Sequence, residues 1–157
     1  MVEVEVRYQN TVHVAASPVD AWALLSDVQR SGLHFPDVDT LQPSPRGPGA
    51  WTWTMKEKGL GPITLRVQYD ATYEADPDAQ SVCWHPTAKG SGDMDSYGSW
   101  TLSPAADGGT ELAFEARTVA YVKASRLVSK MVEVVAREEL SKLKARYVEA
   151  IKRTLDA

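Results

Sequence analysis

The sequence is poor in cysteine, in long apolar runs and in surplus positive charge. Among its 157 residues there is one cysteine, Cys83, which excludes an internal disulfide and a metal site made of several cysteines. The formal net charge of −4 and the lack of a basic aromatic patch argue against nucleic acid as a partner. No apolar run could span a bilayer, and the opening residues lack the basic start and apolar core of a signal peptide. We therefore expect a cytoplasmic protein with a single domain over residues 1–157 and no stable membrane insertion.

Glycine and proline are also absent from residues 125–155, which predicts one long amphipathic helix. Opposite charges stand four residues apart on its polar side, as in Glu138 with Lys142, and Ser125 is the expected N-cap. The apolar residues recur in steps of three and four: Val128, Met131, Val132, Val135, Ala136, Leu140, Leu143, Tyr147, Ala150 and Ile151. A helix of this kind needs a large apolar surface to cover one of its faces.

Most of the chain before this helix alternates apolar and polar residues, which is the pattern of half-buried strands. Turn signals separate the strands, for example at residues 76–78 and 107–109. A further strand over residues 38–42 is expected at a sheet edge, because prolines follow it closely. The other strands are predicted over residues 2–14, 51–56, 63–74, 81–85, 94–102 and 112–118. Strands joined by hairpins, without interleaved helices, form an antiparallel sheet.

Two short helices are expected between the first strand and the rest of the sheet. Ser17 and Pro18 mark a helix start, as N-cap and first helical residue. Residues 31–32 end this helix or a second helical turn behind it, and Pro36 then forces an extended exit. The chain is thus predicted to be α+β, with an antiparallel sheet of about seven strands and one long C-terminal helix.

This order of elements resembles the START-like helix-grip superfamily (SRPBCC), which includes the Bet v 1 allergens, the lipid-transfer START domains and the bacterial polyketide cyclase/dehydrase-like proteins. The similarity is carried by residues 16–27 (ASPVDAWALLSD), by the step from His34 to Pro36, and by the closing hairpin over residues 98–114. It covers essentially the whole chain and implies a curved sheet wrapped round the C-terminal helix, with a deep apolar cavity between them. Residues 34–37 (HFPD) lack the Phe-Val-Pro-Trp-type segment of the coenzyme Q-binding branch, which argues against that branch.

The resemblance implies a hydrophobic small molecule, such as a lipid or a polyketide, bound in the cavity of a carrier or sensor. An alternative within the family is a polyketide aromatase/cyclase or dehydratase that works without metal, and a third is a co-chaperone-like interaction module. A carrier is expected to have a gated apolar pocket, an enzyme a titratable pair inside it, and an interaction module a filled core with an exposed apolar patch. No cofactor is expected, and the sequence leaves the oligomeric state open.

Large side chains in the inward phase of the strands are the candidates for ligand contact. Five tryptophans are an excess in a chain of this size, and each inward-facing one either fills the core or lines the cavity. The mouth of the cavity is expected at residues 34–36, at the turn over 59–62 and at the loop over 89–92. The predicted ligand-binding residues are His34, Phe35, Trp53, Met55, Val67, Tyr69, Trp84, Met94, Trp100, Phe114, Val135, Glu139 and Leu143.

Glu139 is the acid that most invites a chemical role. It stands four residues from both Val135 and Leu143, so on an unrotated helix it points into the cavity, where burial without a partner would raise its pKa. If the apolar stripe rotates along the helix, Glu139 lies at its margin beside Lys142. The three histidines lie on separate predicted elements, and none has the spacing of a metal ligand. No catalytic residue and no metal ligand is therefore assigned.

Overall fold

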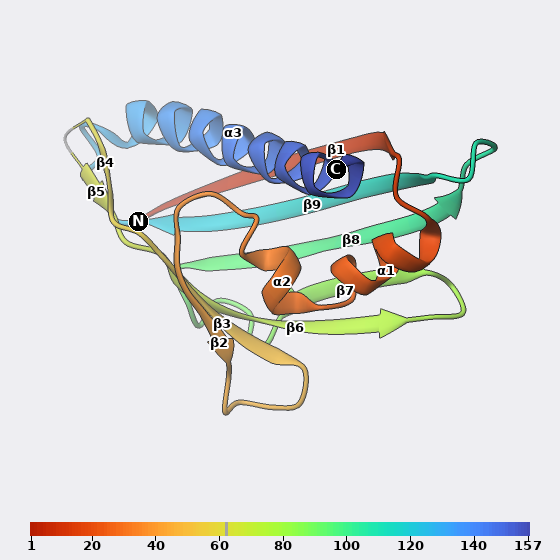
Figure 1. The fold of residues 1–157 in the computed structure, drawn as a ribbon. Helices are drawn as coiled ribbons and strands as arrows, with labels where there is room; N and C mark the ends of the chain where they lie inside the picture. The colour runs from red at the N-terminus through yellow and green to blue at the C-terminus, as the bar shows by residue number, and fades with distance from the viewer. Residues whose placement is uncertain (62) are drawn as a thin grey trace.

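The computed structural model describes residues 1–61 and 63–157, and it shows a curved antiparallel sheet with one long helix lying along it (Figure 1). Seven strands form the main sheet. Two short helices follow the first strand, and the long helix ends the chain. The predicted α+β helix-grip architecture is confirmed.

All neighbouring strands in the main sheet pair in the antiparallel sense. The first and the last strands of the chain lie side by side, with Val2 opposite Val122 and Val14 opposite Thr110. In sheet order the strands are β1 (Val2–Val14), β9 (Thr110–Val122), β8 (Met94–Pro104), β7 (Ser81–Pro86), β6 (Gln68–Asp76), β3 (Ala50–Met55) and β2 (Val38–Pro43).

A separate two-stranded sheet is formed by β4 (Lys58–Leu60) and β5 (Ile63–Leu65). The predicted strand over residues 63–74 is therefore wrong in its first part, because β6 begins only at Gln68. The Gln68 amide donates to the side chain of Asp93 (2.8 Å) rather than to a neighbouring strand. The chain leaves the main sheet at this point, and the β4–β5 hairpin lies near the start of the long helix (Figure 1).

Within residues 1–61 and 63–157, three helices complete the fold: α1 (Pro18–Leu25), α2 (Val28–Gly32) and α3 (Ser129–Asp156). Ser17 caps α1 as predicted, since its hydroxyl accepts a hydrogen bond from the Asp20 amide at 3.2 Å. The prediction that Ser125 caps the long helix is wrong. The chain uses residues 123–128 to cross from β9 to α3, and Val128 precedes the helix without a side-chain cap.

The buried apolar side chains form two clusters under different parts of α3. The cluster at its C-terminal half contains residues of the helix together with the side chains they pack against: Val14, Leu24, Leu25, Trp100, Leu102, Leu112, Phe114, Tyr147, Val148, Ile151 and Leu155. The cluster at its N-terminal half likewise joins helix residues to those of the sheet: Val4, Val6, Met94, Ala120, Val122, Val132 and Ala136. The first cluster contains the large aromatic residues, whereas the second is built mainly of valine and alanine.

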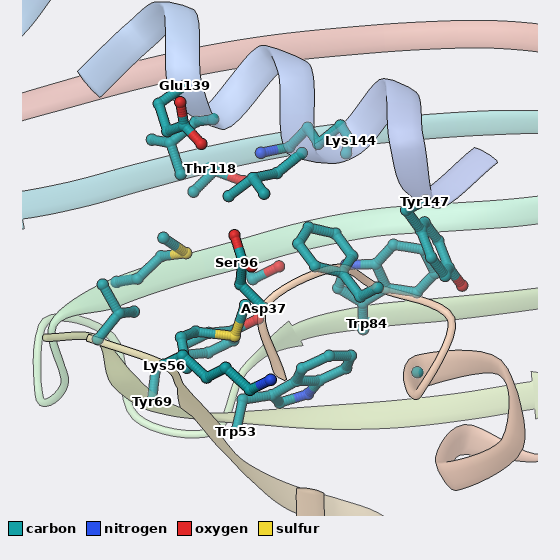
Figure 2. A pocket seen from close by; sticks show the side chains of 18 of the residues that line it. Asp37, Trp53, Lys56, Tyr69, Trp84, Ser96, Thr118, Glu139, Lys144 and Tyr147 are labelled. Carbon is teal, nitrogen blue, oxygen red and sulfur yellow. The ribbon is translucent and has the colours of Figure 1, made fainter. Parts of the chain in front are cut away.

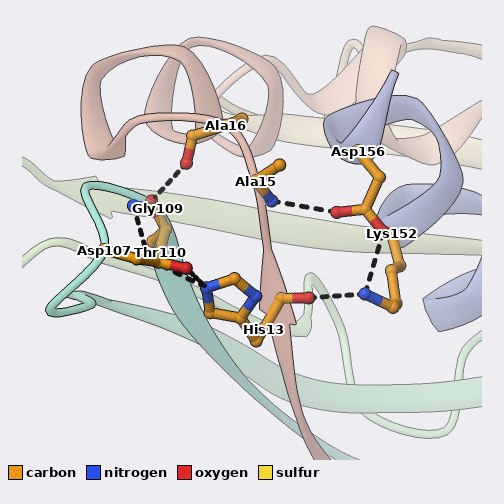
Figure 3. A network of polar contacts seen from close by, with 8 residues as sticks. All are labelled: His13, Ala15, Ala16, Asp107, Gly109, Thr110, Lys152 and Asp156. Carbon is orange, nitrogen blue, oxygen red and sulfur yellow. Dashed lines mark hydrogen bonds and ion pairs between the residues drawn. The ribbon is translucent and has the colours of Figure 1, made fainter.

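Polar contacts fix the C-terminal end of α3 to the far end of β1 (Figure 3). The Lys152 amine donates to the His13 carbonyl (2.6 Å), and the Asp156 carboxylate accepts from the Ala15 amide (2.9 Å). The His13 ring contacts Asp107 in the β8–β9 turn at 2.9 Å. His13 therefore connects three segments of the chain at this end of the molecule.

Candidate functional site

A cavity of about 110 Å³ lies between the inner face of the sheet and α3 (Figure 2). Both core clusters contribute residues to its walls, so it occupies the space between them. A straight helix cannot follow a twisted sheet along its whole length, and a space remains where the side chains between them are small. A cavity of about 150 Å³ in another protein accepts benzene. The closed cavity here suits a small ring or a short chain, and a larger ligand requires its walls to move.

Aromatic side chains form a continuous band along the cavity. Trp53 and Tyr69 are stacked, with ring centroids 6.0 Å apart and planes 3° apart. Phe35 meets Trp53 edge-on at 6.1 Å and lies 5.2 Å from Tyr147 of α3. Tyr147 in turn lies 5.6 Å from Phe114 of β9. Such ring pairs favour particular mutual orientations, so the band gives the cavity apolar walls of defined shape.

Trp84 extends this band across the strands, and a glycine makes room for it. Trp84 pairs with Gly98 of β8, where an added Cβ would stand 2.3 Å from the indole ring. The indole lies 6.0 Å from Phe114 and 5.6 Å from Tyr73. Only a residue without a side chain at position 98 lets the indole lie against the sheet.

A few polar side chains interrupt the apolar walls. Ser96 of β8 and Thr118 of β9 are register partners, and both line the cavity. Tyr69, Tyr73 and Tyr147 also line it, and burial raises the pKa of each phenol above its usual range. The three phenols are therefore neutral at physiological pH and can donate hydrogen bonds.

Among the described residues, Lys144 is the one charged residue of α3 that is buried. Its side chain lines the cavity, and the residue is only 5% exposed. Figure 2 shows it on the underside of α3, between the helix and the sheet. Burial lowers the pKa of its amine to about 8, and no neighbouring acid acts against this shift. Nothing among residues 1–61 and 63–157 forms an ion pair or hydrogen bond with the amine.

Sequence reasoning missed Lys144, although a signal for it exists. Ala136, Leu140, Lys144 and Val148 follow one another in steps of four, so Lys144 shares a face with three apolar residues. We did not include Lys144 among the predicted ligand-binding residues of this helix, which are Val135, Glu139 and Leu143. The spacing alone would have placed Lys144 on the inner face.

A bridge of charged residues stands at the partly exposed end of the cavity. The Lys58 amine contacts the Glu139 carboxylate and lies 3.2 Å from the carboxylate of Asp37. The hydrogen bond to Glu139 is the main reason why the pKa of Lys58 is raised. These three residues, here called the Lys58 bridge, join the loop after α2, the strand β4 and the helix α3. The side chain of Asp37 is 39% exposed, so the bridge lies at a partly exposed part of the cavity wall.

Neither expectation for Glu139 holds in full. Its carboxylate lines the cavity, but it has a partner, and that partner is Lys58. Lys142 instead pairs with Glu138 at 3.1 Å on the outer face of the helix. The partner of Glu139 comes from a distant part of the chain, which helical spacing could not reveal.

Most of the predicted ligand-binding residues meet around this one cavity: Phe35, Trp53, Met55, Val67, Tyr69, Trp84, Met94, Phe114, Glu139 and Leu143. Their contact with a ligand stays a prediction. The predicted residues that do not line the cavity are His34, Trp100 and Val135. Residues 89–92, predicted at the mouth, do not line it either, and Pro62 lies outside the described residues.

Each of the three misplaced residues has a physical reason for its position. The His34 ring bonds to the Arg30 carbonyl (2.7 Å) and the Thr154 hydroxyl (2.8 Å), which fixes it between α2 and the end of α3. Trp100 is buried in the C-terminal cluster, where its indole donates to the Tyr147 hydroxyl at 3.0 Å. Val135 lies beside the cavity because the inward face of α3 passes through Ala136.

The described residues offer no metal site: nowhere among them do three His, Cys, Asp or Glu side chains gather closely enough. Of the helices in residues 1–61 and 63–157, none is long and apolar enough to cross a membrane. The polar side chains that line the cavity include Lys144, the Lys58 bridge, Lys56 and a few hydroxyls in an aromatic surround.

Comparison with known proteins gives one family and several similar folds. The family described as polyketide cyclase / dehydrase and lipid transport matches residues 5–148. No curated protein matches the chain. The Zhui aromatase/cyclase from Streptomyces sp. R1128 is 17% identical with a TM-score of 0.59, over 96% of this chain and 96% of that chain. A START superfamily protein from Mycobacterium smegmatis is 17% identical with a TM-score of 0.62, over 95% of this chain and 98% of that chain.

A third similar structure contains two domains. The di-domain ARO/CYC StfQ from the steffimycin biosynthetic pathway is 18% identical with a TM-score of 0.61, over 97% of this chain and 51% of that chain. At such low identities, similar structures establish a shared fold, and a fold of this kind serves several functions.

Proposed function

Since this chain belongs to the polyketide cyclase/dehydrase and lipid transport family, we propose that it is a carrier or sensor for a hydrophobic small molecule bound under α3. The observation that carries this proposal is the unfilled cavity of about 110 Å³ in the middle of the core. Its walls are mainly aromatic and aliphatic, with a few polar groups, which is the usual make-up of a small-molecule site.

The cavity has a stability cost that a bound ligand would offset. Wall atoms that face open space lack the dispersion contacts that a close-packed core would give them. A ligand that fills the space restores the dispersion contacts of the wall atoms. Such a ligand stabilises the folded state in proportion to its affinity and concentration.

The Lys58 bridge gives the carrier a gate. Lys58 connects Asp37 with Glu139, and these residues belong to segments on different sides of the entrance. Partly exposed ion pairs are weak, typically about 1 kcal/mol or less, so such a bridge can open at little cost. A ligand larger than the closed cavity enters when the bridge opens and α3 or the β4–β5 hairpin moves outward.

A polyketide aromatase/cyclase or dehydratase is the second candidate, and one observation favours it. The Glu139 carboxylate and the Lys144 amine both line the cavity, as the acid and base groups of an enzyme would. The aromatic band could hold a substrate in a reactive shape. The carrier is preferred because Lys58 holds Glu139 at the entrance. An interaction module is the least favoured, since its core would be filled.

The test begins with native mass spectrometry of freshly purified protein and titration with an apolar naphthalene fluorophore. A carrier binds the probe, with a blue shift in probe emission and quenching of tryptophan. If no apolar probe binds at about 50 μM, a range that detects weak affinity, the binding proposal fails.

The variant Glu139→Gln separates the two candidates. In an enzyme that uses Glu139, the substitution abolishes turnover while the probe still binds. In a carrier, it alters affinity by about tenfold or less, the worth of one hydrogen bond. Glu138→Gln, on the outer face of the same helix turn, is the matched control, because its carboxylate pairs only with Lys142 among the described residues.

A further inference from the structure

We propose that the cavity selects a ligand that carries a carboxylate, and that Lys144 binds this carboxylate while the aromatic band holds the apolar body. This inference rests on the proposed binding function and names the chemical class of the ligand. The ligand is an apolar carboxylic acid, either a fatty acid or an aromatic acid. The two sources share the same charged group and differ in the shape of the apolar part.

The first argument is the position of the amine. Lys144 is only 5% exposed, and its side chain lies on the underside of α3, between the helix and the sheet, where it lines the cavity (Figure 2). Long lysine side chains ordinarily extend until the charge reaches water. A lysine that ends in an apolar space therefore needs a partner, because a buried charge without one is destabilising.

The second argument is that the protein supplies no anion to this amine. Asp37 and Glu139 line the same cavity, but Lys58 holds both at the entrance. Nothing in the described chain bonds to the Lys144 amine. A ligand carboxylate would supply the missing charge, and charge-assisted hydrogen bonds in a dry site are stronger than neutral ones.

The third argument is the set of hydroxyls on the opposite wall. Ser96 and Thr118 stand opposite each other on β8 and β9, and both line the cavity that Lys144 enters. Hydroxyl groups donate to carboxylate oxygens. The amine from the helix and the two hydroxyls from the sheet thus place donors on two walls of one cavity, while the remaining walls are mainly apolar. Such an arrangement orients an acid with its charged group inward, between sheet and helix.

Other titratable groups surround the cavity, and they bear on any pH dependence. Those that line it are Asp37, Lys56, Lys58, Tyr69, Tyr73, Glu139 and Tyr147. Burial raises the pKa of the three phenols above their usual range, so they stay neutral over the range of the test. From β1, which also packs on α3, Val4 and Val6 belong to the cluster that contains Ala136. Lys144 is thus the group whose charge changes near pH 8.

The experiment measures affinities by calorimetry for two matched pairs of probes: 2-naphthoic acid with 2-naphthylmethanol, and decanoate with decan-1-ol. We expect the wild-type protein to bind at least one acid about tenfold or more tightly than its alcohol, the worth of a hydrogen bond to a charged group. The pair with the larger difference identifies the aromatic or the aliphatic source.

Variants then assign the preference to Lys144. Lys144→Met removes the charge at similar volume, so it should abolish the preference for the acid and leave the affinity for the alcohol within about threefold. Lys144→Arg should keep the preference. Lys142→Met is the control, since Lys142 lies on the outer face and pairs with Glu138. An unchanged preference in Lys144→Met, or an equal loss for acid and alcohol, would overturn the inference.

The wild-type protein alone supplies a second measurement that needs no variant. The charged amine binds the acid, so acid affinity should be constant from about pH 6 to just below pH 8. Above this range it should fall as the amine loses its proton, by up to the factor by which the wild type prefers the acid, with proton uptake on binding. Alcohol affinity should not change over this range. Acid affinity without this fall overturns the role of Lys144, whereas failure of all four probes to bind overturns the binding function itself.

Discussion

The two halves of α3 cover two different kinds of interior. The C-terminal half presents Tyr147, Val148, Ile151 and Leu155 to a cluster of large aromatic and aliphatic residues. The N-terminal half presents Val132 and Ala136 to smaller side chains from β1, β8 and β9. Between them lies the cavity, where Lys144 enters and where the Lys58 bridge stands at the edge.

The difference indicates that one part of the helix mainly stabilises the fold and another part mainly borders the binding cavity. Close packing under the C-terminal half fixes the helix to the sheet, and the polar contacts at His13 and Lys152 hold its end. Under the N-terminal half, small side chains leave room for a ligand, and a partly exposed ion pair holds the helix in place. Substitutions near the C-terminal end of α3 should therefore change mainly stability, and substitutions of residues that line the cavity should change mainly binding.

The largest effect is expected in the filled half. Ile151→Ala removes a side chain that is fully buried, so the free energy of unfolding should fall by about 2–5 kcal/mol. Probe affinity should stay within about threefold of the wild type, because Ile151 does not line the cavity. Urea denaturation and probe titration measure the two quantities. Val134→Ala, at a position that is 58% exposed on the same helix, is the control. A large loss of affinity with little loss of stability would contradict this difference between the two parts of the helix.

The converse substitution places a larger side chain in the cavity. Ala136→Phe places a ring in the cavity, so affinity for 2-naphthylmethanol should fall about tenfold or more, while overpacking lowers stability by about 1–3 kcal/mol at most. Val134→Phe, on the exposed side, should leave affinity unchanged. The measurement is fluorescence titration with the neutral alcohol. Binding of that probe at wild-type affinity would mean that it does not occupy this cavity.

Removing the Lys58 bridge should change the rates of probe binding and release more than the equilibrium affinity for the probe. Lys58→Met removes the contacts to Asp37 and Glu139, so stopped-flow fluorescence should show probe association and release both accelerated several-fold. Stability should change by about 1 kcal/mol or less, since these pairs are partly exposed. Lys89→Met, at an exposed position that does not line the cavity, is the control. If the Lys58 variant leaves both rates unchanged, the entrance lies elsewhere.

The smallest effect is expected at the polar contacts of Figure 3. Hydrogen bonds from His13 and from the Gly109 amide lower the pKa of Asp107 below its usual 3.8. A lowered carboxyl pKa stabilises the fold above pH 3.8, and this contribution is lost as the pH falls through the lower folded-state value. The melting temperature of Asp107→Asn should therefore lie slightly below that of the wild type near neutral pH and approach it in acid. A gap that stays constant down to the acid limit would refute this role.

The fold could be predicted from the sequence because its signals are local and repeated. Alternation in the strands, the Ser17-Pro18 start of α1 and the uninterrupted helical pattern all agree on one arrangement. The β4–β5 hairpin was missed because the alternation in residues 63–74 continues across the break. At that break the Gln68 amide bonds to the side chain of Asp93, a contact far along the chain that local alternation does not contain.

The site could be predicted only in part, for a related reason. The alternation of inward and outward side chains along the strands placed Trp53, Tyr69, Trp84 and Phe114 on the inner face of the sheet, and all four line the cavity. The pairing of Glu139 with Lys58 spans a sequence separation of 81 residues, so no local pattern contains it. Lys144 was missed although helical spacing places it on the inner face.

The pairing of β1 with β9 has a consequence for how the chain folds. Val2 pairs with Val122 and Val14 with Thr110, so β1 must wait for residues 110–122 before its neighbour in the sheet exists. Contacts between such distant segments slow folding, because a long loop must close before they form. During synthesis β1 leaves the ribosome first, with Val4 and Val6 uncovered until β9 and α3 arrive. The strand made first is thus among the last to be completed, and we expect nascent chains that end before β9 to require protection from aggregation.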